Sequence, residues 1–116
     1  MWMVNPRLMC RKHLLGEHVE LHMFVAQLKR GLNLAGYFEK RLLEVHNIAR
    51  RHAQLAAEMR RRGYRHRSPL PSFRQRRAGR VDRRANQREL AARCVHCRHL
   101  QQAGGWRGHP AATEDA

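Results

Sequence analysis

The sequence is short of acidic residues and of lysine. Only 9 of its 116 residues are Asp or Glu, against 24 that are Lys or Arg, and the formal net charge is +15. So large an excess of positive charge usually means a polyanionic partner, most commonly nucleic acid. The lysines are only Lys12, Lys29 and Lys40, and the abundant arginines suit bidentate contacts with phosphate. The composition therefore predicts a nucleic-acid partner.

Long apolar runs are also missing. No stretch approaches the roughly 18 consecutive apolar residues that a membrane span needs. The opening segment carries Arg7, Arg11 and Lys12 among its apolar residues, which is unlike a secretory signal peptide. We therefore expect a cytoplasmic protein with no membrane partner. The length suits one domain with one small core, and a monomer is the simplest expectation.

Cysteine is scarce, and its odd number argues against a disulfide scaffold. Cys94 and Cys97 form a C-x-x-C element with His96 and His99 nearby, but a closed zinc site needs four suitably placed ligands, so Cys10 would have to approach as well. We expect reduced, partly buried thiols and no metal or other cofactor. A small zinc-stabilised RNA- or ribosome-associated protein built around this element is a less favoured alternative.

Helix signals divide the chain into three segments. Asn5 can cap and Pro6 can open a long helix that we expect to run to Arg30, before the stop signal at Gly31. A second helical pattern starts near residue 36 or 37 and should end at Gly63. Asp82 can cap a third helix that reaches about residue 101.

The segment from 64 to 80 combines arginines with two helix-breaking prolines. Pro69 and Pro71 exclude a regular helix, and Phe73 stands among the basic residues, a composition suited to a phosphate backbone. The last residues, 103–116, are rich in Gly, Pro and Ala and predict a disordered tail. The expected architecture is all-α: a compact three-helix domain over 1–102, with a basic loop between the second and third helices.

One face of the first predicted helix carries residues that could do chemistry. Spacings of 4, 3 and 4 place four side chains on this face: His13, Glu17, Glu20 and Phe24. Two carboxylates then lie about one turn apart. For an isolated helix, a solvated charged face is the favoured interpretation over a site.

The surrounding residues change that balance. The run L-M-C-R-K-H-L-L-G-E-H-V-E-L, residues 8–21, resembles the H-L-x-x-E-x-x-E-L core of the pyrimidine-dimer DNA glycosylases of the phage endonuclease V type, with His13, Glu17 and Glu20 in register. Residues 42–64 resemble the second helix of that family, and residues 81–94 its third. The resemblance implies a compact three-helix domain that binds double-stranded DNA.

The resemblance also implies a repair activity: excision of a pyrimidine dimer by a glycosylase, followed by strand cleavage at the abasic site. In the family, the α-amine of the chain attacks C1′ of the sugar and forms an imine. An α-amine suits this task because its ordinary pKa, about 7.7 to 8.0, leaves a usable fraction unprotonated near neutral pH. The implied catalytic residues are Glu20 and the amine of Met1.

Other site residues follow from the same resemblance. The family begins with a small residue and Arg before the positions of Met1 and Trp2, so the resemblance implies an N-terminus shortened by two residues. Its lesion-contacting arginines correspond to Val19 and Met23. The side chains expected to contact substrate or DNA are His13, Arg7, Arg11, Lys12, His22, Arg61, Arg62, Arg65 and Arg67. A non-catalytic basic nucleic-acid-binding module of the same fold is the alternative.

Overall fold

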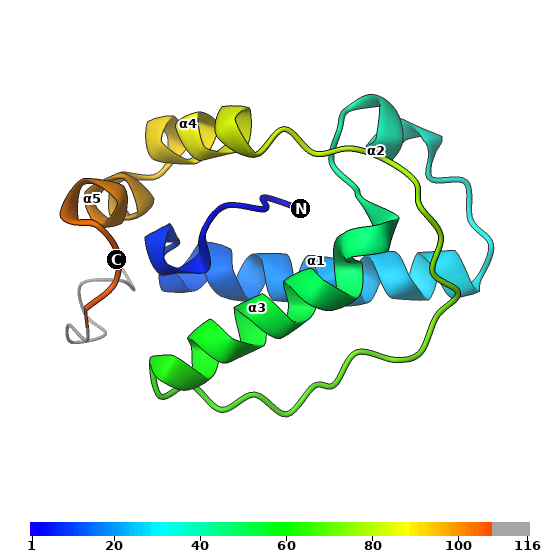
Figure 1. Cartoon of the computed structure of the whole chain (residues 1–116), viewed down its shortest axis with the longest axis horizontal. Helices are drawn as coiled ribbons and strands as arrows, with labels where there is room; N and C mark the ends of the chain where they lie inside the picture. Colours follow the sequence, from blue (N-terminus) through cyan, green and yellow to red (C-terminus); the bar gives the residue numbers. More distant parts are fainter. Residues whose placement is uncertain (108–116) are drawn as a thin grey trace.

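The computed structural model describes residues 1–107, and all regular secondary structure in this part of the chain is helical (Figure 1). The elements are η1 (Pro6–Leu8), α1 (Arg11–Lys29), α2 (Ala35–Glu39), η2 (Val45–Asn47), α3 (Ile48–Arg61), α4 (Arg83–Arg93) and α5 (Val95–Ala103). The predicted all-α class is confirmed for these residues. The prediction of three helices is wrong, because residues 1–107 contain five α-helices.

Each predicted helix is interrupted by a residue with non-helical backbone. Cys10 is extended, with φ −70° and ψ 166°, so that a short 3₁₀ turn precedes α1. Arg41 has φ 58° between α2 and η2, and Cys94 is extended between α4 and α5. The predicted caps are confirmed: the side chain of Asn5 accepts from the Arg7 N–H, and that of Asp82 from the Ala85 N–H.

The core forms where α1 and α3 pack against each other. Figure 1 shows these two helices crossing, with α4 and α5 at one end of the molecule. From α1, Leu14, Leu21 and Phe24 are fully buried. The helical pattern predicted for the second segment is confirmed over α3, where Ile48 and Leu55 are fully buried. No helix among residues 1–107 is long and apolar enough to span a membrane.

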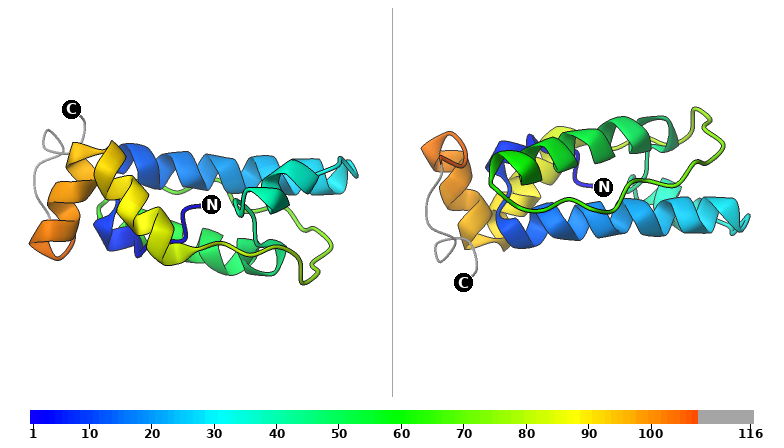
Figure 2. Two further views of the ribbon diagram at one scale, coloured as in Figure 1. Left: turned by 90° about the horizontal axis from the view of Figure 1, so that it is seen from above. Right: turned by 90° about the horizontal axis from the view of Figure 1, so that it is seen from below.

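The predicted basic loop, residues 64–80, has no regular secondary structure and connects α3 to α4 along one side of the molecule (Figure 2). Its end is firmly held: the Val45 N–H donates to the Ala78 carbonyl at 2.9 Å, and the Val81 N–H donates to Glu44 at 2.6 Å. At Gly79, φ is +86° and an added Cβ would lie 1.9 Å from the Leu43 carbonyl oxygen. The loop is therefore anchored to the core.

The predicted tail boundary is wrong for residues 103–107. Gly104 ends α5 with a left-handed φ of 82°, and the Trp106 N–H then donates to the Arg7 carbonyl at 2.8 Å. The Trp106 ring lies 5.2 Å from the guanidinium carbon of Arg61 and 5.4 Å from that of Arg62. These cation–π contacts offset the Gly-rich composition. The rest of the predicted tail, 108–116, lies outside the described residues.

Candidate functional site

The N-terminal amine meets a carboxylate from α1. The nitrogen of Met1 lies 2.5 Å from Oε1 of Glu20 and donates to the Leu42 carbonyl at 2.8 Å. The Met1 side chain is fully buried, whereas 37% of the Glu20 side chain is exposed. The pair is therefore anchored on one side and open to solvent on the other. Chemically, it joins a nucleophilic nitrogen to a group that can accept its proton.

The N-terminal segment that carries this amine lies between α1 and α4 (Figure 1). The side-chain amide of Asn86, on α4, donates to the carbonyls of Met1 and Trp2 at 3.3 and 3.0 Å. The Glu44 N–H contacts the sulfur of Met1 at 3.4 Å. Residues distant in sequence therefore fix the amine opposite Glu20.

Glu17 contacts the same N-terminal segment and links it to α3. Its two carboxylate oxygens accept from Nε and Nη2 of Arg51, both at 2.7 Å, and both side chains are buried. The Met3 N–H also approaches Glu17, at 3.4 Å. The solvated-face interpretation is therefore wrong for Glu17: the guanidinium from α3 compensates the buried carboxylate, and the pair ties α1 to α3 beneath the N-terminus.

The structure places His13 among three thiols. Its Nδ1 lies 3.2 Å from Sγ of Cys10 and 3.6 Å from Sγ of Cys97, while Sγ of Cys94 lies 3.9 Å from that of Cys10. The hydrogen bond with the Cys97 side chain lowers the pKa of Cys10 to about 4 and raises that of Cys97. The approach of Cys10 to the C-x-x-C element could not be predicted from spacing, because 84 residues separate Cys10 from Cys94.

His22 joins a histidine cluster, which we define as His18, His22, His52 and His66. In five pairs of these rings the centroids lie 4.8 to 5.2 Å apart. Nε2 of His22 and Nε2 of His52 bond to the carbonyl of Ser68 at 3.1 and 3.2 Å, which holds the start of the basic loop. Burial, followed by the charges of the neighbouring histidines, lowers the pKa of His18 to about 4. One local feature of the sequence could have indicated this cluster, the i, i+4 spacing of His18 and His22.

The predicted DNA-binding cations fall into two groups. One group is exposed: Arg7, Arg11, Lys12, Arg61, Arg65 and Arg67. By contrast, Arg62 is buried and donates to the carbonyls of Pro6 and Met9 at 3.0 and 2.7 Å. Burial opposes ionisation of Glu58, but hydrogen bonds from Arg61 and Arg62 outweigh it and lower its pKa. Arg62 therefore has a structural role within the fold.

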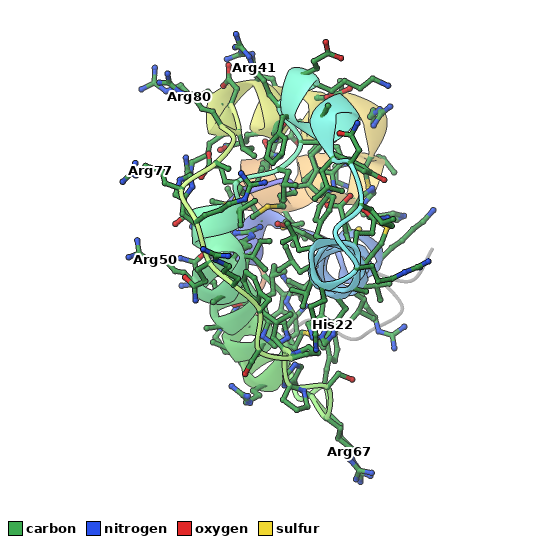
Figure 3. All side chains as sticks on the ribbon, turned by 90° about the vertical axis from the view of Figure 1, so that its right-hand side faces the viewer. His22, Arg41, Arg50, Arg67, Arg77 and Arg80 are labelled. Atoms are coloured by element: carbon green, nitrogen blue, oxygen red, sulfur yellow. The ribbon has the colours of Figure 1, made fainter. Side chains whose placement is uncertain are left out.

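An arginine-lined surface adjoins the site, and sequence reasoning missed part of it. Two grooves of about 600 and 750 Å³ share Arg50, Arg83 and Asn47. Figure 3 shows Arg41, Arg50, Arg77 and Arg80 extending on the same side of the molecule. Glu44 lies beneath; burial raises its pKa, but hydrogen bonds from Asn47 and Val81 and the charge of Arg83 lower it overall. We call this surface the basic face, formed by Arg41, Arg50, Arg77, Arg80 and Arg83.

Comparison with known proteins assigns the chain to a family. The family model for pyrimidine dimer DNA glycosylase matches residues 1–72. The chain belongs to the pyrimidine dimer DNA glycosylase family. The matched part of this glycosylase-family chain includes Met1, Glu20 and α3, whereas α4 and α5 lie beyond it. Membership of a DNA glycosylase family implies a DNA substrate. No curated protein and no solved structure matches the chain.

Proposed function

We propose that the protein is a DNA glycosylase with associated abasic-site lyase activity, acting on pyrimidine dimers in duplex DNA. The observation that carries the proposal is the contact of the Met1 amine with Glu20 at 2.5 Å. In a member of this family, an N-terminal amine beside a carboxylate is the arrangement that imine chemistry requires. The exposed edge of Glu20 leaves room for a sugar to approach.

The proposed reaction uses both groups. The amine gives its proton to Glu20, and its lone pair attacks C1′ of the damaged nucleotide. The glycosidic bond breaks, and its electron pair leaves with the pyrimidine. Loss of a second proton and opening of the sugar ring give an imine, and β-elimination then expels the 3′ phosphate before water releases the sugar. Glu20 stabilises the cationic intermediates and carries protons between these steps.

The basic face is the proposed DNA-binding surface. Its guanidinium groups come from the connection between α2 and η2, from α3, from the basic loop and from α4, and four of the five line the grooves. Phosphate contacts of this kind bind duplex DNA without regard to sequence and weaken as salt rises. Selectivity would then come from the distorted DNA at a lesion, where a nucleotide is more easily extruded.

Borohydride reduction tests the proposal because it traps an imine as a stable covalent adduct. The substrates are a duplex with one thymine dimer and a duplex with one abasic site. Three proteins are compared: the chain as given, its Glu20→Gln variant, and a chain extended by Ala-Arg before Met1. Glu89→Gln is the matched control, since Glu89 is an exposed carboxylate on α4 that pairs with Arg93 at 3.6 Å.

We expect trapping by the unmodified chain and by Glu89→Gln. Glu20→Gln should reduce its rate by at least about 100-fold, the usual scale of a lost acid–base group. Trapping only by the extended chain would move the nucleophile from Met1 to the added residue and leave Glu20 in its role. Salt-dependent DNA binding without trapping by either chain would contradict the enzyme proposal and favour the non-catalytic binding module.

A further inference from the structure

Four metal-ligating side chains meet at one end of α1. Sγ of Cys10, Cys94 and Cys97 and a ring nitrogen of His13 all lie within 4.8 Å of one another. They come from two separate parts of the chain, the start of α1 and the junction of α4 with α5. We call these four residues the thiol cluster. All three cysteines are free thiols.

The two parts present their ligands in the same way. Cys10 is the extended residue before α1, and His13 is the third residue of that helix. Cys94 is the extended residue before α5, and Cys97 is the third residue of that helix. Each ligand pair therefore spans a cap and the first turn of a helix. The backbone leaves the helical conformation at both caps, which lets the two pairs face each other.

The distances in the thiol cluster fit a tetrahedral ion. With zinc–sulfur bonds of about 2.3 Å and zinc–nitrogen bonds of about 2.0 to 2.1 Å, the edges of a tetrahedron are about 3.8 Å between sulfurs and about 3.5 Å between sulfur and nitrogen. The sulfurs of Cys10 and Cys94 lie 3.9 Å apart, and Nδ1 of His13 lies 3.2 Å from the sulfur of Cys10 and 3.6 Å from that of Cys97. A disulfide would need about 2.05 Å.

Backbone N–H groups point at two of the sulfurs of the thiol cluster. The Cys10 N–H donates to Sγ of Cys97 at 3.2 Å, and the Cys97 N–H donates to Sγ of Cys94 at 3.5 Å. Backbone donors of this kind stabilise negative charge on sulfur and orient a ligand for its metal. The first turns of α1 and α5 add the positive ends of two helix dipoles. Cys10 and Cys97 are buried, which protects the cluster from solvent.

We propose that Cys10, His13, Cys94 and Cys97 bind one zinc ion in a closed structural site. Three soft sulfurs and one imidazole select zinc over harder cations such as magnesium. With four protein ligands, the ion has no open position for substrate, so its role is to join the α4–α5 junction to the start of α1. Only Cys10 and His13 lie within the residues that the family model matches. This inference departs from the sequence expectation of no metal.

The first test is the metal content of the full chain, purified from zinc-supplemented culture and measured by mass spectrometry. We expect about one zinc per chain, and a loss of most of it in Cys97→Ser and His13→Gln. His96→Gln and His99→Gln are matched controls, because His96 lies within the C-x-x-C element and His99 two residues after it, but neither belongs to the cluster. Both should retain the metal. Retention by His13→Gln with loss in either control would overturn the assignment.

Cobalt(II) provides a second readout that does not depend on how well the variants fold. Replacing zinc by cobalt in the unmodified chain should give intense visible bands, typical of a tetrahedral ion, and a near-ultraviolet sulfur-to-cobalt charge-transfer band. Weak octahedral bands without charge transfer would overturn the proposal, as would thiols that react freely with a disulfide reagent before any chelator is added. Glu20→Gln should bind zinc fully, which separates this site from the proposed catalytic chemistry.

Discussion

The thiol cluster and the histidine cluster both include residues of α1, and they differ in what their sulfur and ring nitrogen atoms face. In the thiol cluster, sulfur and nitrogen acceptors face one another while backbone N–H groups donate from outside. In the histidine cluster, Nε2 of His22 and Nε2 of His52 both face the Ser68 carbonyl. A carbonyl only accepts, so these two nitrogens donate hydrogen bonds and are not available as metal ligands. The thiol cluster therefore leaves its acceptors facing a common centre, whereas two imidazoles of the histidine cluster hold the basic loop.

Zinc removal should produce the largest effect and should affect only the thiol cluster. Chelation is expected to lower Tm by more than about 10 °C, since a structural zinc contributes directly to folding free energy. Hydrogen exchange should then accelerate in α4 and α5, which the ion joins to α1, and stay slow at Leu55 in the middle of α3. Faster hydrogen exchange around His52 instead would contradict the assignment of the zinc to the thiol cluster.

The end of the basic loop near Gly79 extends this comparison, because the histidine cluster holds only the start of the loop. Gly79→Ala should destabilise the protein by about 2 to 4 kcal/mol, since its Cβ would collide with the Leu43 carbonyl at a positive φ. Gly16→Ala is the control: it lies in α1 with no atom within 4 Å of the added Cβ. It should stabilise by about 0.5 to 1 kcal/mol. Denaturant unfolding measures both, and equal effects would refute the loop anchor.

Acidification should loosen the histidine cluster by a smaller amount. The pKa of His18 falls from 6.5 to about 4 on folding, chiefly through burial, so between these values the unfolded chain binds a proton that the folded chain excludes. Stability is then fully present above about pH 6.5 and declines as the pH falls toward 4. We expect a decrease in Tm of several degrees across this window.

The control for the pH experiment is His18→Gln, which has no proton to gain and should show a smaller decrease. His22, His52, His66 and Arg60 face the same region and remain titratable or charged in both proteins. Cobalt charge-transfer absorption reports separately on release of metal from the thiol cluster. An unchanged pH dependence in His18→Gln would contradict the assignment to this histidine.

The smallest expected effect concerns DNA affinity. Arg77→Ala removes an exposed guanidinium from the basic face and should make the slope of log affinity against log salt shallower by about 1. Arg98→Ala is the matched control, because Arg98 is exposed on α5 and bonds to the Ala91 carbonyl. Fluorescence anisotropy with an undamaged duplex measures both slopes. A larger change in slope for Arg98→Ala than for Arg77→Ala would show that the DNA binds outside the basic face.

Local sequence signals predicted much of the fold, and the departures have a common cause. The caps at Asn5 and Asp82 and the apolar face of α3 depend on nearby residues, so they could be predicted. The helix breaks at Cys10 and Cys94 could not, because the surrounding residues suit a continuous helix. At both positions the backbone leaves the helical conformation because the members of the thiol cluster, which are distant in sequence, come together there. Trp106 was missed for a similar reason: Arg61 and Arg62, at the end of α3, order a segment whose composition is typical of disorder.

In the candidate site, too, the residues set by local sequence could be predicted and those set by tertiary packing could not. Glu20 could be predicted, since its register with a family motif is local, and the structure places it against the Met1 amine. Arg50 and Arg83 could not, because they come from separate helices and meet only in the folded grooves. Glu17 belongs to the same motif, but its burial against Arg51 depends on α3. Sequence pattern indicated the residue types, and tertiary packing decided their roles.

The most direct test of the account is to locate the sugar on the protein after borohydride trapping. The unmodified chain is reacted with the thymine-dimer duplex, reduced, digested with nuclease and protease, and sequenced by mass spectrometry. The account predicts the sugar remnant on the α-nitrogen of Met1. A remnant on Lys12, Lys29 or Lys40, or the absence of any adduct under conditions where the duplex is bound, would contradict it.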